Sequence, residues 1–195
     1  MAHVQLQHVD AAEAGDLRHG QEYKKRKTQM TEFKEMRRKR QQLPEEESVA
    51  LLRHATSGVL SLLDCNGYPY GVPISYAYAE GKLLFHSAVS GQKIDAIRHA
   101  DKASFTVICK DEVHPETFTT HFRSVICFGR VRIVDNANEK LHALRLLGER
   151  YNPGDEHALD DEIKKSGNHV AVIELDIERI TGKEAIELTR MRKQE

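Results

Sequence analysis

The middle of the chain alternates between apolar and polar residues and contains short apolar runs, a pattern that predicts β-strands. A strand repeats with a period of two, whereas an amphipathic helix repeats its apolar residues every three or four positions. Gly, Pro and Asn separate the runs and mark the turns between them. The pattern predicts six strands, over residues 58–64, 68–79, 82–88, 102–109, 123–135 and 169–183.

Helical spacing occurs before this strand-rich region and at two places within it, between the third and fourth strands and between the fifth and sixth strands. Pro44, followed by three glutamates, is typical of a helix N-terminus, because proline fits the first turn and carboxylates favour the positive end of the helix dipole. Gly167 is typical of a helix end. The spacing predicts helices over residues 44–55, 91–99, 138–151 and 155–167, and a short charged helix over 31–42.

The turns between the runs indicate how the strands pair. Asn-Gly at 66–67 and Glu-Gly at 80–81 are tight-turn signals, so the strands that flank them pair antiparallel. Pro69 and Pro73 cannot donate a backbone hydrogen bond, which places their strand at an edge, at a bulge or at a strand start. A doubly wound parallel sheet would need a helix after nearly every strand. The expected fold class is therefore mainly β, an antiparallel barrel with peripheral helices.

The length of 195 residues suits one domain with a tail. We expect residues 1–29 to be a weakly ordered extension and residues 30–195 to be the domain, with a basic segment at 30–42. No apolar run approaches the ~18 residues of a membrane span, and the N-terminus lacks the features of a secretory signal. Three cysteines without a CxxC pair argue for a reducing compartment. We therefore expect a cytoplasmic protein without a membrane partner.

The formal net charge of −1 gives the whole molecule no attraction for nucleic acid. The charge is nevertheless uneven, because nine Lys or Arg lie between Lys24 and Arg40. Such an arm can contact phosphates or anionic lipid, or it can be a solvated tail. Tyr23 and Phe33 offer few aromatic rings for stacking on bases. The solvated tail is the favoured interpretation, and nucleic acid is not expected as a partner.

The main candidate chemistry lies in the stretch FHSAVSGQKIDAIRHA, where a predicted strand meets a predicted helix. Ser90 stands where a helix N-cap belongs, and Gly91 and Gln92 would then present free backbone N–H groups. Gly91 also lets a ligand approach the backbone closely, and Lys93 adds a full positive charge. A helix N-terminus of this kind binds anions, so the stretch is a candidate phosphate site.

His86 and Ser87 end the preceding strand, so their polar groups could line the rim of the same pocket. The alternative interpretation is ordinary punctuation between a strand and a helix, for which Ser-Gly is common. The stretch alone does not decide between these two interpretations.

Five segments in order resemble the pyridoxamine phosphate oxidase-related split-barrel flavoproteins, and the nearest branch contains the nitroimidazole-resistance reductases. The segments are MRRKRQQL, GVLSLLDCNGYPYGVPISYAY, KLLFHSAVSGQKIDAIR, FRSVICFGRVRIV and VAVIELDIERITGKEA. The resemblance runs from about Phe33 to Glu187. It implies a six-stranded antiparallel split β-barrel, a homodimer, and FMN at each of two sites along the dimer interface.

The resemblance also implies which residues contact FMN. Main-chain groups in the segment YGVPIS would meet the polar edge of the flavin ring, and the helix entry would hold the phosphate. Ser124 stands where the oxidases have a glutamine that reaches the flavin. The implied cofactor-binding residues are Tyr70, Pro73, Ile74, Ser75, His86, Ser87, Gly91, Gln92, Lys93, Arg123 and Ser124.

The chain also departs from the true oxidases. Tyr70 stands where they carry an arginine that neutralises the phosphate, and Gly-Gln-Lys at 91–93 replaces their Arg-Lys. The oxidases end in a segment with Arg and Trp that grips the pyridoxal substrate. This chain has no tryptophan and ends in ELTRMRKQE. Oxidation of pyridoxamine phosphate is therefore not expected.

A group of side chains that could bind a metal begins at the end of the fourth predicted strand and continues toward the fifth. Its members are Cys109, Asp111, Glu112, His114, Glu116 and His121. Their spacing fits no standard metal motif, and HPETFTTHF is expected to be a solvated loop, with His121 and Phe122 near the flavin. The sequence therefore predicts no metal.

The favoured hypothesis is an FMN-dependent oxidoreductase that reduces small aromatic acceptors, such as nitroaromatic compounds or quinones. The redox chemistry would belong to the flavin, and the protein would position it. His86 is the candidate catalytic residue, because imidazole can donate a proton near neutral pH. The alternative is a protein that uses the same barrel to carry or sense a flavin, a deazaflavin or haem without turnover.

Overall fold

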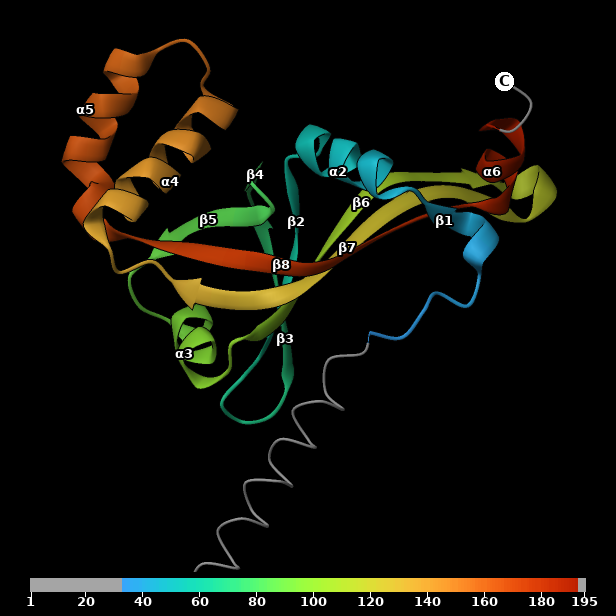
Figure 1. The fold of residues 1–195 in the computed structure, drawn as a ribbon, viewed down its shortest axis with the longest axis horizontal. Coiled ribbons are helices and arrows are strands. Elements are labelled where there is room, and N and C mark those ends of the chain that lie inside the picture. Colours follow the sequence, from blue (N-terminus) through green and yellow to red (C-terminus); the bar gives the residue numbers. More distant parts are fainter. Residues whose placement is uncertain (1–32, 193–195) are drawn as a thin grey trace, which may run out of the picture. The chain divides into compact units, whose positions relative to one another are not determined.

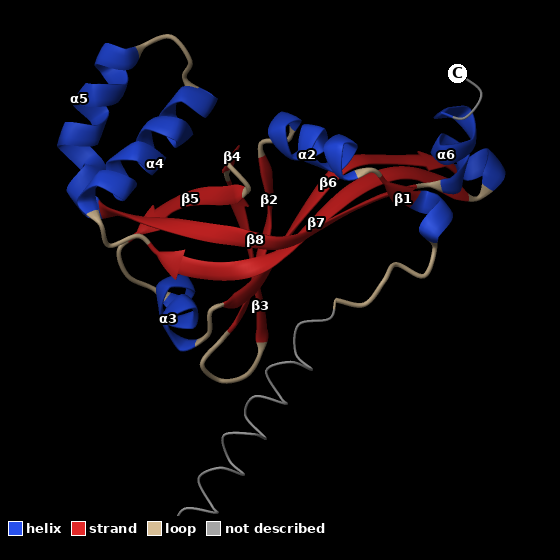
Figure 2. Cartoon of the chain, viewed as in Figure 1, coloured by secondary structure: helices blue, strands red, loops and turns tan. Residues whose placement is uncertain are grey.

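The computed structural model describes residues 33–192, and the chain divides into two units between Arg37 and Arg38. The second unit is built on one antiparallel sheet of eight strands with helices on its surface (Figures 1 and 2). The strands are β1 Gln42–Leu43, β2 Ser57–Leu63, β3 Pro69–Ser75, β4 Ala77–Ala79, β5 Lys82–Ala88, β6 Lys102–His114, β7 Thr119–Ile133 and β8 Val170–Glu184. The α-helices are α2 Glu45–His54, α3 Gln92–His99, α4 Ala137–Tyr151, α5 Glu156–Ser166 and α6 Ile186–Arg192.

The two strands at the ends of the sheet are consecutive in the chain, so the sheet must curl until its ends lie close together. Its order is β3-β2-β6-β7-β8-β5-β4, with β1 paired to β8. Tyr76 alone separates β3 from β4 in sequence. The sheet is therefore a barrel that is split between β3 and β4, and the predicted mainly β, antiparallel split-barrel class is confirmed. Eight strands replace the predicted six, because the run 68–79 breaks at Tyr76 and β1 adds a short strand.

The two predicted tight turns are present, with different lengths. Glu80 and Gly81 join β4 to β5, and their φ values of 51° and 78° are typical of a two-residue type I′ turn. Gly67, with a φ of 84°, donates its N–H to the Asp64 carbonyl at 2.8 Å. The Asn66 side chain accepts the Tyr68 N–H at 3.0 Å. The β2–β3 loop therefore spans five residues and is stabilised by an asparagine side chain.

The helices follow the sequence pattern except near the two ends of the described residues: α6 was not predicted, and the N-terminal side also differs. Helix α2 begins after Pro44, which takes the N-cap position, and its first turn carries the three predicted glutamates. The predicted charged helix over 31–42 is wrong within the described residues, where only the 3₁₀ turn Lys39–Gln41 is helical. Gln42 and Leu43 instead pair with Lys183 and Gly182, so strand pairing overrides the local helical preference.

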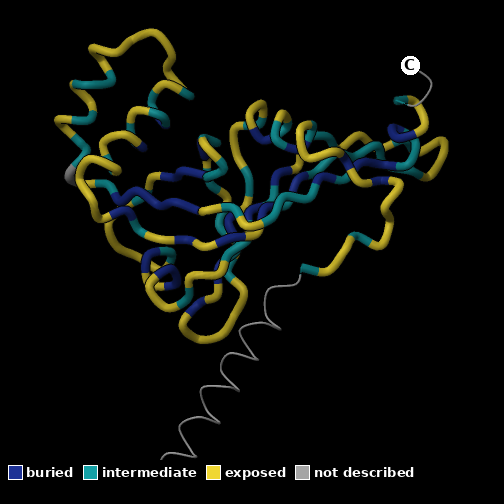
Figure 3. Tube along the Cα trace, in the orientation of Figure 1, coloured by how far each residue is buried: buried dark blue, intermediate teal, exposed yellow. Residues whose placement is uncertain are grey.

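An aromatic cluster forms the centre of the barrel core. The Phe105 ring lies 4.8 Å from the Tyr76 ring and 5.2 Å from the Phe85 ring, and all three side chains are fully buried. Tyr76 donates its hydroxyl to the Leu52 carbonyl at 2.7 Å, and burial raises the pKa of this phenol well above its usual range. Figure 3 shows the buried residues along the middles of the central strands.

A smaller core lies under α4, where Ala143 and Leu147 pack on Leu84 and Val172. The two cores lie on opposite faces of β5, because Leu83 and Phe85 belong to the barrel core. Figure 1 shows α4 and α5 on one side of β5 and β8 and α3 on the other side.

The β6–β7 hairpin is longer than the sequence pattern predicts. The expected loop HPETFTTHF is wrong, because β6 continues to His114 and β7 begins at Thr119, with a short 3₁₀ turn between them. This arm extends past α2 (Figure 1). Val113 and Phe118 are strongly exposed there, and no core packs against them to impose an apolar alternation. Strand pairing therefore continues through residues that lack the alternation of apolar and polar positions by which a strand is predicted.

The three cysteines are unpaired and differ in exposure. Cys127 is fully buried in the barrel core, and burial raises the pKa of its thiol to about 12. Burial also raises the pKa of the Cys109 thiol. The interpretation of Cys127 as a small core residue is confirmed, since a protonated buried thiol is a poor nucleophile.

Candidate functional site

The β5–α3 junction forms the first part of the candidate site. Gly91, not Ser90 as predicted, is the N-cap of α3, and its φ of 120° belongs to a backbone region that favours glycine. The Gly91 carbonyl accepts the N–H groups of Ile94 and Asp95 at 2.8 and 3.1 Å. A Cβ atom at Gly91 would meet no heavy atom within 4 Å, so the space in front of the helix end is open.

Lys93 adds a positive charge at this open helix end. Its Nζ donates to the Ser87 Oγ at 2.9 Å. Within residues 33–192, no carboxylate lies within ion-pair distance of this ammonium group. The ammonium group therefore keeps its positive charge uncompensated, since its partner is a neutral hydroxyl. The first N–H groups of α3 also have no acceptor within the helix, so this helix end attracts an anion. The structure therefore brings Ser87, Gly91 and Lys93 together as the sequence predicts.

Gln92 has a different role from its neighbours, because its side chain points toward the β2–β3 loop. Its Nε2 donates to Asp64 Oδ2 at 3.1 Å. The Cys65 thiol lies 3.8 Å from the Asp95 carbonyl oxygen, which joins α3 to the same loop. The backbone N–H of Gln92, rather than its side-chain amide, therefore belongs to the candidate anion site.

Strand alternation separates His86 from Ser87. Successive side chains of a strand point to opposite faces. Phe85 lies in the barrel core, so Ser87 lies on that face and His86 lies on the face covered by α4. The two adjacent residues therefore belong to two different environments, which the sequence pattern did not separate.

His86 and Ser75 line a cavity of about 390 Å³ between the sheet and the α4–α5 pair. A volume in this range suits a small organic ligand. The remaining lining residues are mainly apolar: Leu144, Leu147, Gly148, Tyr151, Leu159, Glu162, Ile163, Ser166, Gly167 and Val170. The sequence analysis missed this helical wall. The sequence pattern predicted the helix itself, but no local signal showed which strands it would cover.

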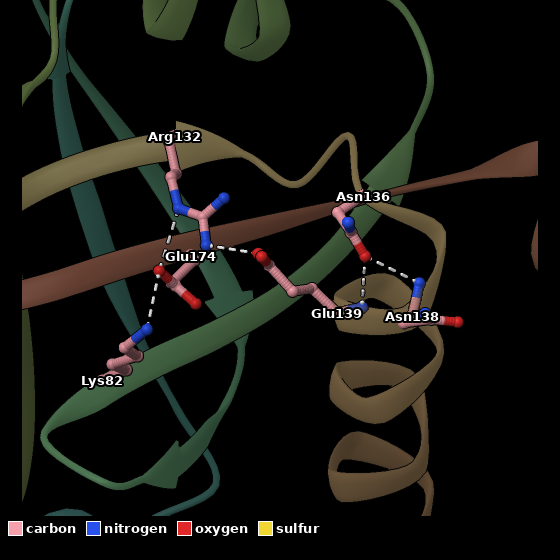
Figure 4. Close-up of polar contacts among 6 residues, drawn as sticks. All are labelled: Lys82, Arg132, Asn136, Asn138, Glu139 and Glu174. Carbon is pink, nitrogen blue, oxygen red and sulfur yellow. Dashed lines mark hydrogen bonds and ion pairs between the residues drawn. The ribbon is translucent and has the colours of Figure 1, made fainter.

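A network of ion pairs fixes α4 over this cavity (Figure 4). Glu174 of β8 accepts hydrogen bonds from Lys82 at 3.1 Å and from Arg132 at 3.0 Å. Arg132 also donates to Glu139, in the first turn of α4, at 2.7 Å. Asn136 caps the same helix by accepting the N–H groups of residues 138 and 139. The helix that roofs the cavity is therefore bound to β5, β7 and β8 at its N-terminus.

The other end of α4 is fixed to the strand break at Tyr76. The Tyr151 hydroxyl lies 2.6 Å from the Thr56 carbonyl oxygen and 2.7 Å from the Tyr76 carbonyl oxygen. Arg150 donates to the carbonyls of His54 and Ala55 at the end of α2. Both ends of α4, which covers part of the cavity, are therefore attached to the rest of the domain.

Strand β3 offers an unpaired edge to a ligand. Among the described residues it pairs only with β2, so the predicted edge position of this strand is confirmed. Tyr70 and Ile74 are half-buried against the barrel core, and Pro73 between them is exposed. Backbone groups on the outer edge of a terminal strand have no ladder partner. The segment from Pro73 to Ser75 therefore has main-chain groups that can bind a polar ring edge.

Arg123 and Ser124 lie far from Ser87, and so from the β5–α3 junction, within one chain. Arg123 pairs with Glu184 near the end of β8, whereas Ser87 pairs with Ala171 near its start. At ~3.3 Å per residue, Ala171 and Glu184 are about 40 Å apart along β8. The Arg123 Nε also donates to the fully buried Glu184 carboxylate at 3.3 Å. The β5–α3 junction and the Arg123–Ser124 pair thus form two groups that a single chain does not unite.

The sequence model of the pyridoxamine 5'-phosphate oxidase family matches residues 44–184. The matched region begins just before α2 and ends with β8, so it contains strands β2 to β8 and both groups of candidate residues. Among curated proteins, none matches the chain.

Several solved structures share the fold at low sequence identity. A candidate 5-nitroimidazole antibiotic resistance protein from Bacteroides thetaiotaomicron is 22% identical, with a TM-score of 0.62 over 73% of this chain and 85% of that one. The flavocytochrome Anf3 from Azotobacter vinelandii is 23% identical, with a TM-score of 0.64 over 73% and 67%. The FAD and heme binding protein from Mycobacterium smegmatis is 20% identical, with a TM-score of 0.65 over 74% and 73%.

The helices are short relative to a lipid bilayer. In the part of the chain that the structure describes, none combines the length and the apolar character needed to cross a membrane.

Proposed function

Since the chain belongs to the pyridoxamine 5'-phosphate oxidase family, we propose that it binds FMN and reduces small aromatic acceptors. The observation that carries the proposal is the unneutralised Lys93 ammonium beside Ser87 at the open N-terminus of α3. Flavin-binding and haem-binding proteins among the structural neighbours support the same class of ligand. The three unpaired cysteines fit the reducing cytoplasm as its location.

The phosphate would bind at the β5–α3 junction. Lys93 would form a charge-assisted hydrogen bond with one phosphate oxygen, and the first backbone N–H groups of α3 would bind the others. The Ser87 hydroxyl holds the ammonium in place at 2.9 Å. Gly91 keeps the approach open, because any side chain there would project into the space that the phosphate needs.

The outer edge of β3 is the best surface for the flavin ring. Its main-chain groups between Pro73 and Ser75 would bind the polar edge of the ring, and Tyr70 would lie beside it. Tyr70 supplies no positive charge, so the phosphate would depend on Lys93. That dependence, with the absence of tryptophan, argues against oxidation of pyridoxamine phosphate.

When bound, FMN supplies the hydride and electron chemistry of the reaction. The chain's own contribution is the cavity wall, on which His86 and Ser75 are polar groups among mainly apolar side chains. A flat aromatic acceptor would bury its ring against the leucines of α4. His86 would donate a proton to a polar substituent of that acceptor, with Ser75 orienting it.

A homodimer would unite the two groups of candidate residues. Arg123 and Ser124 of one chain would then complete the site formed by Lys93 in the other. Ile108, Val113 and Phe118 on the β6–β7 arm are at least two-thirds exposed, as expected for side chains that a second copy covers. Sedimentation should give a dimer for the natural chain and a shift toward monomer for Phe118→Ala, with Tyr68→Ala as the exposed aromatic control. A monomeric natural chain would exclude the shared site.

Lys93→Ala is the direct test of the phosphate site. We expect its Kd for FMN to rise about 10- to 100-fold, because a hydrogen bond to a charged group contributes about 1.5–3 kcal/mol. Flavin fluorescence quenching measures this Kd, and Lys102→Ala, an exposed lysine on β6, is the matched control. Equal FMN binding by Lys93→Ala and the natural chain would place the phosphate elsewhere.

A second candidate function follows from the position of His86 on an apolar cavity wall. Imidazole in an apolar pocket is a haem ligand in many proteins, so the barrel could carry haem without turnover. A Soret band that disappears in His86→Ala would favour the haem carrier. Reduction of bound FMN by NAD(P)H, followed by reoxidation with a quinone or nitroaromatic compound, would favour the enzyme.

A further inference from the structure

The β6–β7 arm places two imidazoles and a carboxylate in one cluster. Glu112 and His114 lie two positions apart on β6, so they share a face of the strand. His121 of β7 pairs directly opposite Glu112. Candidate ligand atoms of the three side chains all lie within 4.8 Å of one another. Backbone pairing therefore assembles the cluster from residues that the sequence pattern assigned to a loop.

His114 is oriented as a metal-binding histidine is. Its Nδ1 lies 3.0 Å from Glu116 Oε1, so the proton on Nδ1 donates to that carboxylate and leaves the Nε2 lone pair free. Nε2 is buried without a hydrogen-bond partner among the described residues, 3.8 Å from Glu112 Oε1. In metal sites, a histidine that binds the metal through one ring nitrogen usually donates the N–H of its other ring nitrogen to a carboxylate. That hydrogen bond fixes the tautomer and the orientation of the ring.

The other two side chains are also restrained. The His121 ring stacks on the His114 ring with centroids 3.8 Å apart. Lys110 binds Glu112 Oε2 at 2.7 Å, which leaves Oε1 for a second partner. With neutral imidazoles, Lys110, Glu112 and Glu116 give the cluster one net negative charge, which favours a cation.

The chemistry of the donors selects the ion. Two imidazole nitrogens with one carboxylate oxygen form a ligand set found for Zn²⁺ and for Fe²⁺, whereas Mg²⁺ and Ca²⁺ prefer oxygen ligands. Bonds of about 2.0–2.2 Å would bring the donors closer than 4.8 Å, which needs only side-chain rotation at this exposed hairpin. Three protein ligands leave an open coordination position for water.

We propose that Glu112, His114 and His121 bind a divalent transition-metal ion at the tip of the β6–β7 arm. Glu116 is a positioning residue that orients His114. Within one chain, the site lies on a different part of the sheet from Lys93 and from the His86 cavity.

Zn²⁺ titration of the full chain by calorimetry tests the site. We expect one Zn²⁺ per chain, and a loss of affinity of at least about 100-fold in His121→Ala. Glu116→Gln should weaken binding about tenfold, because the amide supports His114 less well than the carboxylate. His142→Ala, an exposed histidine on α4, is the matched control and should bind Zn²⁺ like the natural chain.

Co²⁺ provides a second readout, since its visible absorption reports nitrogen ligation directly. The natural chain should develop these bands, and His121→Ala should not. The histidines of the N-terminal segment remain in every variant, so the difference between variants isolates the arm. The proposal is wrong if His121→Ala binds Zn²⁺ as tightly as the natural chain, or if the natural chain binds none.

Discussion

Phe105→Ala is expected to lower the free energy of unfolding by about 3–5 kcal/mol, the range for removing a fully buried phenylalanine ring. Phe105 has no exposed surface and contacts both Tyr76 and Phe85 through its ring. Its removal leaves a cavity at the point where β2, β6 and the Tyr76 strand break meet. Urea unfolding at one fixed protein concentration measures the change.

The matched control for this substitution is Tyr68→Ala, which removes an aromatic ring that is 72% exposed on the β2–β3 loop. We expect its effect to stay within about 0.5 kcal/mol, because the loop is held by the Tyr68 backbone and the Asn66 side chain. Similar effects of Phe105→Ala and Tyr68→Ala on unfolding would contradict the aromatic cluster as the centre of the core.

The strands that were predictable are those with one face in the barrel. Ala171, Ile173 and Leu175 of β8 lie on one face of the strand, and all three belong to the barrel core. Gly81 specifies its turn locally, because a positive φ is needed there. Where the β6–β7 arm leaves the barrel, its residues are half-buried or exposed and none is buried in a core, so the period that predicts a strand is lost. Hydrophobic patterning therefore reveals a strand only as far as the core extends.

The candidate phosphate site was predictable because its parts are neighbours in sequence. Ser87, Gly91 and Lys93 lie within one strand-to-helix junction, and the chain needs only that local geometry to bring them together. The N-cap was misplaced by one residue, since Ser90 has the better capping side chain but Gly91 has the backbone freedom that the junction needs.

The cavity and the metal cluster required contacts that no local pattern contains. Ser75 and His86 meet α4 because Ala143 and Leu147 of the helix pack on the sheet. Glu139 and Tyr151 attach its two ends. His121 meets Glu112 only through the register of a hairpin whose strands looked like a loop. Contacts between residues far apart in sequence create both the cavity and the metal cluster. The sequence pattern therefore identifies candidate residues but does not show which of them come together.

Gly129→Ala is expected to destabilise the protein by about 3 kcal/mol or more, at the upper end of overpacking effects. Gly129 lies in the middle of β7, where the register with β8 shifts and leaves Glu178 as an extra residue. A glycine inside a strand marks such a bulge or a close backbone approach. A Cβ atom here would collide with the Asp176 carbonyl oxygen and lie 2.9 Å from the Asp176 carbonyl carbon. A backbone carbonyl cannot rotate away as a flexible side chain can. Strands β7 and β8 would therefore have to move apart at this position.

Gly71→Ala is the matched control, because it adds the same methyl group to another strand glycine. On β3 the new Cβ atom would meet only the Val59 side chain, at 3.3 Å, and the strand lies at the sheet edge. We expect the unfolding free energy of Gly71→Ala to change by less than about 1 kcal/mol, since alanine also restricts the unfolded chain. Urea unfolding of both variants separates crowding at the bulge from a general effect of the methyl group. If Gly129→Ala were no less stable than Gly71→Ala, the β7–β8 bulge would have to be looser than the structure shows.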